Sequence, residues 1–283
     1  MSRVALVVHE GREAAVRAAG DIEAMLAAEG AETARAQDGE VPEAADLVLS
    51  VGGDGTFLRA AHLASLLAAP VLGVKVGRMG FLTEVGPEDA GPLVRAVLAG
   101  EARIEERLAV TAEHEGGPAF EPQWALNEVM VEKHARHRLV RLAVEVDGDY
   151  VTTFSADGVI VASPTGSTAY SFSARGPIVS PDVESLILTP VAAHMVFDRS
   201  FVLDPGSEVS LEVMGEESGI LSADGRESVE LPVGSRVRIR ASSRPAALVR
   251  RDDAPGFLSL VRDKFGLPGD DNDDEADDVG SPG

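Results

Sequence analysis

Residues 47–68 read LVLSVGGDGTFLRAAHLASLLA. The first part, Leu47–Val51, is an apolar run, interrupted only by Ser50, of the kind found in strands that are covered on both faces. The last part, Thr56–Ala68, is rich in alanine and leucine and favours a helix. Three glycines at residues 52–55 lie between the two parts and permit a tight turn. The stretch therefore predicts a buried strand that leads directly into a helix.

The same alternation of strand and helix signals occurs on both sides of this stretch. Upstream, the apolar run Val4–Val8 precedes the helical pattern Glu13–Ala28. Downstream, the apolar run Val71–Val76 precedes the helical pattern Pro92–Leu98. Repeated strand and helix units are typical of a parallel sheet flanked by helices. The sequence therefore predicts an N-terminal α/β domain over residues 1–105.

Beyond residue 105 the pattern changes to that of an all-β domain. Leu142–Val146 has β-type alternation and is followed by the turn signal Asp147-Gly148. A second alternating segment lies at Val237–Arg240. We therefore expect a β-sandwich of two packed sheets over residues 106–249.

The C-terminal end is expected to contain one short helix and a disordered tail. Gly256–Phe265 places its apolar residues mostly on one helical face, and residues 250–267 are expected to pack back on the first domain. Residues 268–283 contain seven carboxylates and are flanked by glycine and proline. Such a segment cannot bury enough apolar surface to order itself, so we expect it to be dispensable.

The composition excludes several kinds of chemistry and partner. The chain has no cysteine, which excludes disulfides, thiolate zinc sites and a cysteine nucleophile. Its formal net charge of -22 repels phosphate backbones and anionic lipid, so neither nucleic acid nor a membrane is expected as a partner. We find no signal-peptide pattern and no apolar run of the roughly 18 to 20 residues that cross a bilayer. We therefore expect a cytoplasmic protein that binds small molecules.

The loop Gly52–Thr56 is the first candidate site. Its glycines allow close approach of a ligand, and the N–H groups at a helix N-terminus bind anions. It is not a Walker loop, because no Lys-Ser/Thr pair follows the glycines. It is not the dinucleotide fingerprint, because the spacing of its glycines differs. Asp54 would repel a phosphate here unless it binds a metal or accepts a proton from an attacking hydroxyl. The alternative is that Asp54 only forms an Asx-turn or a helix N-cap.

Two further groups of polar residues suit nucleotide recognition. The run Ser163–Ser171 supplies short hydroxyl donors beside Tyr170, whose ring suits a base or ribose. Taken alone, such a run is also typical of an ordinary loop. Asn127 and Glu128 lie within the apolar segment Leu126–Val131 and suit a ribose diol. The alternative for this pair is a polar position on an edge strand.

Together these segments resemble the bacterial NAD kinases. The resemblance is carried by Gly52–Thr56, Leu72–Leu82, Leu126–Val129, Asp157–Ile160 and Ser163–Pro177. The glycine-aspartate loop also resembles that of diacylglycerol kinases, sphingosine kinases and phosphofructokinases. The long motif Ser163–Pro177 is much more specific to the NAD kinases.

The resemblance implies an α/β Rossmann-like domain and a C-terminal β-sandwich domain, with the active site between them, in a homodimer or homotetramer. It implies phosphoryl transfer from ATP or polyphosphate to the 2′-hydroxyl of the adenosine ribose of NAD, which makes NADP. Mg²⁺ or another divalent metal would accompany the phosphoryl donor, and no side chain is assigned as a metal ligand. The implied catalytic base is Asp54.

The substrate contacts are expected from residues that match the family's motifs. The residues expected to contact NAD are Asp54, Gly55, Arg59, Phe81, Asn127, Glu128, Arg138, Asp157, Thr168, Ala169, Tyr170, Ser171, Phe172 and Ser173. The residues expected to bind phosphate are Gly52, Gly53, Gly55, Lys75 and Arg78. Arg59 is a further candidate for neutralising phosphate charge.

Two residues depart from the family pattern. Lys75 stands where the family usually has asparagine, and Arg226 stands where it usually has glutamine after the Asp-Gly pair. The added charges would strengthen phosphate binding, mark a changed substrate preference, or have no effect on a solvent-facing surface. Two other functions remain open, a lipid or sugar kinase of the same superfamily and a non-catalytic NAD(P) sensor. The presence of Asp54 argues against the sensor.

Overall fold

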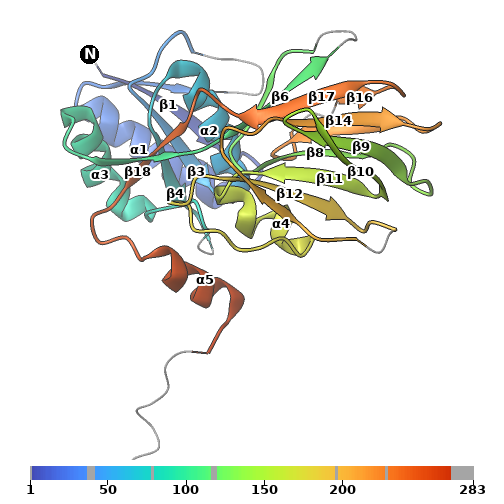
Figure 1. The fold of residues 1–283 in the computed structure, drawn as a ribbon. Helices are drawn as coiled ribbons and strands as arrows, with labels where there is room; N and C mark the ends of the chain where they lie inside the picture. Colours follow the sequence, from blue (N-terminus) through green and yellow to red (C-terminus); the bar gives the residue numbers. More distant parts are fainter. Residues whose placement is uncertain are drawn as a thin grey trace, which may run out of the picture. The chain divides into compact units, whose positions relative to one another are not determined.

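The computed structural model describes residues 2–36, 42–77, 80–115, 120–194, 197–226 and 229–268. The chain divides into two compact units, Met1–Arg251 and Asp252–Gly283. The larger unit contains an α/β domain and an all-β domain, and Figure 1 labels their elements.

The α/β domain is built on one six-stranded sheet with the strand order β2-β1-β3-β4-β18-β5. The strands are β1 (Arg3–Val8), β2 (Glu32–Arg35), β3 (Leu47–Gly52), β4 (Val71–Lys75), β5 (Arg103–Arg107) and β18 (Ala246–Arg250). The helices are α1 (Glu13–Ala28), α2 (Asp54–Leu67) and α3 (Pro87–Ala99). Neighbouring strands are parallel except for β5, which runs antiparallel to β18.

Both faces of this sheet are covered by helices. Successive strand residues point to opposite faces, so β1, β3 and β4 each contribute to two separate clusters. Leu6 and Leu49 pack with residues of α1 and α3 on one face. Val7 and Val48 pack with residues of α2 on the other face. The three helices flank the sheet in Figure 1. Burial on both sides explains why the central strands β1, β3 and β4 are largely apolar, and it confirms the predicted α/β domain.

The all-β domain consists of two six-stranded antiparallel sheets. The first sheet has the order β10-β9-β14-β17-β6-β7 and contains β6 (Val110–Glu115), β7 (Gln123–Ala125), β9 (Val140–Val146), β10 (Asp149–Ala156), β14 (Val209–Met214) and β17 (Arg236–Ala241). The second has the order β13-β12-β11-β8-β15-β16 and contains β8 (Glu128–Lys133), β11 (Gly158–Ala162), β12 (Leu186–Val191), β13 (Phe201–Leu203), β15 (Gly219–Ala223) and β16 (Val229–Leu231). Leu142 and Leu211 of the first sheet share one core with Val131 and Val161 of the second. The two sheets therefore form the predicted sandwich.

The turn between β9 and β10 has the backbone that its sequence predicted. Asp147 has a φ of 53° and Gly148 has a φ of 86°. A two-residue turn with both residues in the left-handed region is the connection that suits the twist of a hairpin.

The chain leaves the α/β domain through β5 and returns to it through β18. The two strands pair from Arg103 opposite Arg250 to Arg107 opposite Ala246. The domain limits expected at residues 105 and 249 fall inside these strands and stay a prediction. The strands are short and contain several charged residues, so hydrophobic periodicity alone does not assign them to the first sheet.

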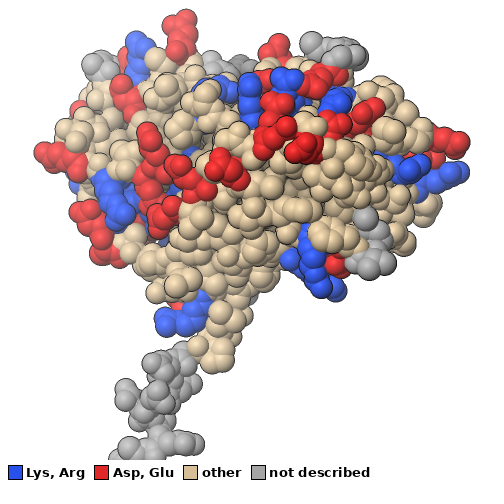
Figure 2. All heavy atoms as spheres, in the orientation of Figure 1, with Lys and Arg blue, Asp and Glu red and all other residues tan. Residues whose placement is uncertain are grey.

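The outer face of the sheet that contains β17 is covered by paired charges. Arg236 lies 3.4 Å from Glu115, and Arg240 lies 2.8 Å from Glu113. Figure 2 shows acidic and basic side chains gathered over β6, β14 and β17. This face is therefore a network of ion pairs at the water-exposed side of the sandwich.

The smaller unit contains α5 (Phe257–Phe265), which confirms the predicted C-terminal helix. The helix ends at Phe265 and is followed by the C-cap residue Gly266, whose φ of 62° suits a glycine. The expected packing of residues 250–267 on the first domain stays a prediction. Residues 269–283 of the expected tail lie outside the described residues. No helix in the described part of the chain is long and apolar enough to span a membrane.

Candidate active site

The turn from β3 into α2 leaves the backbone of two glycines open. Gly52 has no room for a side chain, because an added Cβ would lie 2.5 Å from Oγ1 of Thr56. A Cβ added at Gly53 or Gly55 would meet no atom within 4 Å. The helix begins at Asp54, earlier than the start near Thr56 that the sequence suggested. The first N–H groups of the helix therefore lie beside open space, where a phosphate can approach.

The carboxylate of Asp54 is held by the segment that follows β4. Its Oδ2 accepts a hydrogen bond from the N–H of Phe81 at 2.9 Å, and its Oδ1 accepts one from the N–H of Leu82 at 3.3 Å. Asp54 is the first residue of α2, and the N-cap is Gly53. Its carboxylate thus bonds outside its own helix, which contradicts the alternative that it serves as a helix N-cap.

A glycine in β4 brings this segment close to the strand. A Cβ added at Gly73 would lie 2.8 Å from Cδ2 of Phe57 and 2.9 Å from Cα of Thr83. The N–H of Glu84 donates to the carbonyl of Gly73 at 2.8 Å. Because glycine has no side chain, the segment can lie against Gly73, and this close contact helps to position the N–H groups that hold Asp54.

Three basic residues, Lys75, Arg59 and Arg78, are expected near the glycine turn. Lys75 is half-buried at the end of β4 and lies opposite Gly52 in the sheet register. Arg59 is half-buried on α2, in the second turn after Asp54. Arg78 lies outside the described residues. The structure therefore places Lys75 at the carboxyl ends of the parallel strands, where the glycine turn also lies.

A second group of site residues is held at the start of β8. Asp224, in the turn after β15, accepts hydrogen bonds from the N–H groups of Leu126 at 2.8 Å, Asn127 at 2.8 Å and Glu128 at 3.2 Å. From the other side, the N–H of Ser163 donates to the carbonyl of Asn127 at 2.8 Å. Sequence reasoning did not single out Asp224, whose only signal is the turn pair that it forms with the next glycine.

Glu128 carries an unusual carboxyl group. Its Oε2 is buried and has no hydrogen-bond partner in the described part of the structure. Burial and the nearby charge of Asp224, opposed by the N–H of Tyr170, together raise the pKa of Glu128 to about 8. β8 lies between β11 and β15, so the edge-strand alternative for this pair is wrong. A ligand hydroxyl is a natural partner for the unpaired oxygen.

Asp157 joins the same neighbourhood from the start of β11. Its carboxylate forms an ion pair with Lys133 of β8. Burial raises the pKa of Tyr170, and the charges of Asp157 and Glu128 raise it further, whereas Lys133 lowers it. The structure therefore brings together three of the expected residues, Glu128, Asp157 and Tyr170. Lys133 was missed because a lysine at the end of an apolar strand gives no functional signal.

The run that follows β11 forms two short helices, η1 (Thr165–Thr168) and α4 (Tyr170–Ser173). Tyr170 and Phe172 are 44% and 37% exposed, so part of each ring is available to a ligand. Ser171 is buried, and its Oγ lies 3.1 Å from Oγ1 of Thr189. The remaining expected residues of this run are Thr168 and Ala169, both half-buried, and the exposed Ser173.

Arg138 and Arg226 both have protein partners. Arg138 is exposed and lies 3.3 Å from Glu217. Arg226 donates from Nε to the carbonyl of Ala223 at 3.2 Å and from its terminal nitrogen to the carbonyl of Trp124. Its guanidinium therefore bonds to the backbone of the all-β domain.

One apolar cluster connects the glycine-turn helix to the start of β8. It contains Phe57 and Ala61 of α2 together with Trp124 and Leu126. The rings of His62 and Trp124 also lie close, with centroids 6.0 Å apart. The helix that begins at Asp54 thus packs against the segment that leads into Asn127 and Glu128.

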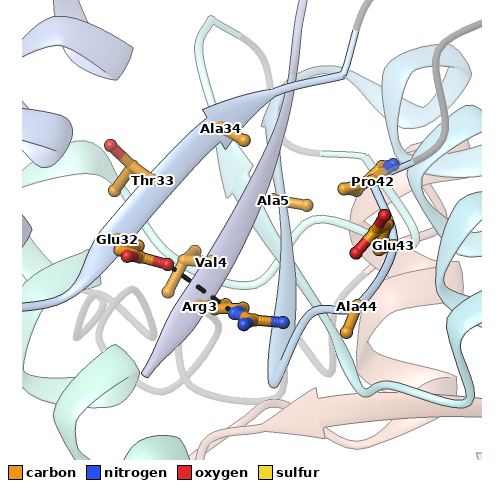
Figure 3. Close-up of a pocket in the computed structure, with 9 residues that line it drawn as sticks. All are labelled: Arg3, Val4, Ala5, Glu32, Thr33, Ala34, Pro42, Glu43 and Ala44. Atoms are coloured by element: carbon orange, nitrogen blue, oxygen red, sulfur yellow. Dashed lines mark ion pairs between the residues drawn. The ribbon is translucent and has the colours of Figure 1, made fainter. Parts of the chain in front are cut away.

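A cavity of about 380 Å³ lies elsewhere on the α/β domain (Figure 3). Arg3 of β1 and Glu32 of β2 line it and point toward one another as an ion pair of 3.6 Å. Both residues begin their strands, whereas Asp54 follows the end of a strand parallel to β1. Ligands of open α/β sheets bind at the carboxyl ends of the strands, so we do not include this cavity in the candidate site.

Two family models match the two domains of this chain. Residues 4–102 match the family described as "ATP-NAD kinase N-terminal domain", and residues 126–251 match "ATP-NAD kinase C-terminal domain". NAD kinase 2 of Streptomyces avermitilis is 39% identical, covering 94% of this chain and 94% of its own length. NAD kinase of Rhodococcus erythropolis is 44% identical, covering 80% of this chain and 73% of its own length.

Solved structures of kinases share the fold. The yeast NADH kinase in complex with NADH superposes with a TM-score of 0.84 at 20% identity, over 95% of this chain and 88% of that chain. The NAD kinase from Archaeoglobus fulgidus in complex with ATP superposes with a TM-score of 0.73 at 28% identity, over 93% of this chain and 97% of that chain.

A helix N-terminus that is open to phosphate and lies beside a held carboxylate, together with polar residues in an adjoining β-sandwich, is the kind of site that a nucleotide-dependent kinase needs. The chain belongs to the NAD kinase family, which is a family of enzymes.

Proposed function

We propose that this enzyme transfers the terminal phosphoryl group of ATP or polyphosphate to the 2′-hydroxyl of the adenosine ribose of NAD. The observation that carries the proposal is the carboxylate of Asp54, held by two N–H groups beside an open glycine turn. A fixed proton acceptor next to a phosphate site is the arrangement that phosphorylation of a hydroxyl needs.

Asp54 is the proposed catalytic base. The 2′-oxygen forms a bond to the terminal phosphorus, the bond from that phosphorus to its bridging oxygen breaks, and the hydroxyl proton passes to Asp54. A carboxylate has about four lone-pair positions, so two N–H bonds leave capacity to accept this proton. Gly53 and Gly55 leave room for the donor's phosphates at the N-terminus of α2, whose dipole favours their charge.

The dinucleotide contacts are proposed on the all-β domain. Asn127 and Glu128 bind ribose hydroxyls, and the unpartnered Oε2 of Glu128 supports this role. Asp157 and Tyr170 adjoin them, and Tyr170 supplies an exposed ring for a base. Further proposed contacts are Gly55, Phe81, Arg138, Thr168, Ala169, Ser171, Phe172 and Ser173. The inward orientation of Ser171 favours a supporting role for that residue.

Positive charge and a metal ion would balance the phosphates. Lys75 and Arg59 are the proposed cations, and Arg78 belongs to the same proposal although it lies outside the described residues. Among the residues that the structure describes, no group of three or more His, Asp or Glu side chains forms a ready metal site. Mg²⁺ is proposed to arrive with the donor, because Mg²⁺ is usually held by few carboxylates together with substrate phosphates.

A donor and acceptor panel tests the proposed function. The purified protein with Mg²⁺ is given ATP, another triphosphate or polyphosphate, and the acceptors NAD, NADH, diacylglycerol and a sugar. We expect NADP from NAD and no phosphorylation of the lipid or the sugar. Product from the lipid or sugar alone would assign the chain to another reaction of the superfamily, and NAD binding without turnover would identify a sensor.

The assembly and location of the enzyme are also proposed from the family resemblance. We expect a homodimer or homotetramer in the cytoplasm, with small molecules as the substrates. Light scattering after size-exclusion chromatography measures the assembly directly, and a monomeric mass would contradict it.

A further inference from the structure

Asp224 is joined to the backbone of the 126–128 segment by four hydrogen bonds. Its Oδ2 accepts from the N–H of Leu126, and its Oδ1 accepts from the N–H groups of Asn127 and Glu128. The N–H of Asp224 donates to the carbonyl of Glu128 at 3.0 Å. Both carboxylate oxygens are therefore used to hold one short segment.

The turn that carries Asp224 aims it at this segment. Asp224 has a φ of 50° and Gly225 has a φ of 65°, so both lie in the left-handed region. Aspartate tolerates this conformation better than most residues. The turn follows Ala223, which pairs with Val129 at the start of β8. The reversal of the chain thus places the Asp224 carboxylate beside the backbone that leads into β8.

We propose that Asp224 is a positioning residue, whose carboxylate fixes the backbone of Asn127 and Glu128 and whose negative charge, together with burial, disfavours ionisation of the Glu128 carboxyl group. This inference rests on the proposed function, since it takes Asn127 and Glu128 to be contacts of the dinucleotide.

Charges from several elements decide which carboxyl group holds the proton. The charged and titratable groups around Glu128 and its neighbour Tyr170 are Asp224 and Arg226 after β15, Tyr170 on α4, Glu132 and Lys133 on β8, and Asp157 before β11. Burial raises the pKa of Asp224, but three N–H donors and Arg226 oppose that shift. Glu128 receives one N–H, from Tyr170, and its Oε2 has no partner in the described structure. Three N–H donors stabilise the ionised form of Asp224, whereas one oxygen of Glu128 has no partner in the described structure, so this hydrogen bonding assigns the negative charge to Asp224 and the proton to Glu128.

This distribution makes binding depend on pH in a defined direction. A ribose hydroxyl donates best to an ionised carboxylate. Because the pKa of Glu128 is raised to about 8, the ionised form becomes dominant only above that pH. Affinity for NAD should rise as pH increases through this value, and removal of the Asp224 charge should move the rise to lower pH.

The test is Asp224→Asn, with NAD affinity measured by calorimetry from about pH 6 to about pH 10. We expect the inflection to move down by about one pH unit. We also expect affinity above the inflection to fall about tenfold, because the amide nitrogen meets an N–H donor. An inflection at the same pH as in the unchanged enzyme would overturn the proposed charge effect.

Asp147→Asn is the matched control. Asp147 also precedes a glycine, has a φ of 53°, and accepts a backbone N–H, from Glu208, at 2.8 Å. It lies at the exposed hairpin between β9 and β10. This variant should keep both the affinity and the inflection, and an effect as large as that of Asp224→Asn would overturn the proposal.

Two further measurements separate this inference from the proposed function. Glu128→Gln should weaken NAD binding and remove the inflection, and unchanged binding would show that Glu128 is no substrate contact. Carbon-13 NMR of the glutamate carboxyl groups, in the enzyme that retains Glu128, follows the titration of Glu128 without NAD. If the pKa of Glu128 does not shift in Asp224→Asn, the charge effect is overturned.

If Asp224→Asn does not fold, Asp224→Glu should keep the inflection and weaken NAD binding. Normal affinity in that variant would overturn the positioning role.

Discussion

Gly80 lies so close to Asp54 that a Cβ added to the glycine would stand 1.7 Å from Oδ1 of the aspartate. The two residues come from different elements, Asp54 from the start of α2 and Gly80 from the segment after β4. The absence of a side chain at Gly80 lets the next two N–H groups reach the carboxylate. The orientation of the proposed base therefore depends on a glycine that makes no contact with substrate in our proposal.

Gly80→Ala should displace the Asp54 carboxylate, because the methyl group and the carboxylate cannot occupy the same space. We expect turnover to fall by about a hundredfold, the lower range of a base's contribution, while affinity for NAD stays within about threefold. Steady-state kinetics and calorimetry measure the two quantities. Gly20→Ala on α1 is the control, since its Cβ meets nothing within 4 Å and should leave turnover unchanged. Normal turnover in Gly80→Ala would show that this contact does not set the base.

Asp54→Asn should remove the proton acceptor while keeping the size of the side chain. One amide oxygen can still accept the N–H of Phe81, so the fold and the NAD affinity should survive. Turnover should fall at least about a hundredfold, and donor affinity should stay the same or rise as a repulsive charge disappears. NADP formation and the melting temperature are measured on the same preparation. If turnover is near normal, Asp54 is not the base, and if folding is lost with it, the residue is structural.

Lys75→Asn restores the residue usual in the family at a position opposite Gly52. The side chain is only half-buried, so the melting temperature should change by less than about 2 °C. The Michaelis constant for the phosphoryl donor should rise several-fold, because a cation near the phosphates is removed. Increasing salt should reduce the difference between the two enzymes. Identical kinetic constants would place Lys75 outside the site.

Arg250→Met should destabilise the fold through a buried carboxylate. Arg250 lies 3.2 Å from Glu84, and the two side chains are 10% and 7% exposed. Arg250 also lies 3.5 Å from Glu105, so its removal takes a cation from two carboxylates and should cost about 3 kcal/mol. Chemical denaturation measures this loss, and Arg250→Met with Glu84→Gln should recover part of it. A single variant as stable as the unchanged protein would show that the pair contributes nothing.

His62 should make the fold sensitive to mild acid. Burial and, to a smaller extent, the charges of Arg226 and Arg244 together lower its pKa from an ordinary value of 6.5 to about 4. Between these two values the unfolded chain binds the proton more tightly than the folded chain, so stability falls as pH decreases through this window. We expect the loss to be about 1 to 2 kcal/mol, after allowing for partial exposure. Denaturation curves of His62→Gln should show a smaller loss over the same window, and an equal loss would assign it to other groups.

Much of the candidate site was visible in the sequence because its residues occupy short motifs. The Gly52–Thr56 loop, the pair Asn127-Glu128 and the run at residues 163–173 each combine a turn or polar signal with an adjoining apolar strand. Lys133 and Asp224 were not visible, because their importance comes from partners in other elements. The partners of Asp224 lie 96 to 98 residues away along the chain.

The sequence by itself determined the local elements and the order of the two domains. Periodicity and turn residues act over a few neighbouring positions, which is why the α1 helix and the Asp147-Gly148 turn were predictable. Tertiary structure alone decided that β5 and β18 join the first sheet, that Gly80 admits the Asp54 carboxylate, and that Asp224 holds the start of β8. These features depend on which distant segments meet, and that depends on the packing of the whole core and not on any local pattern.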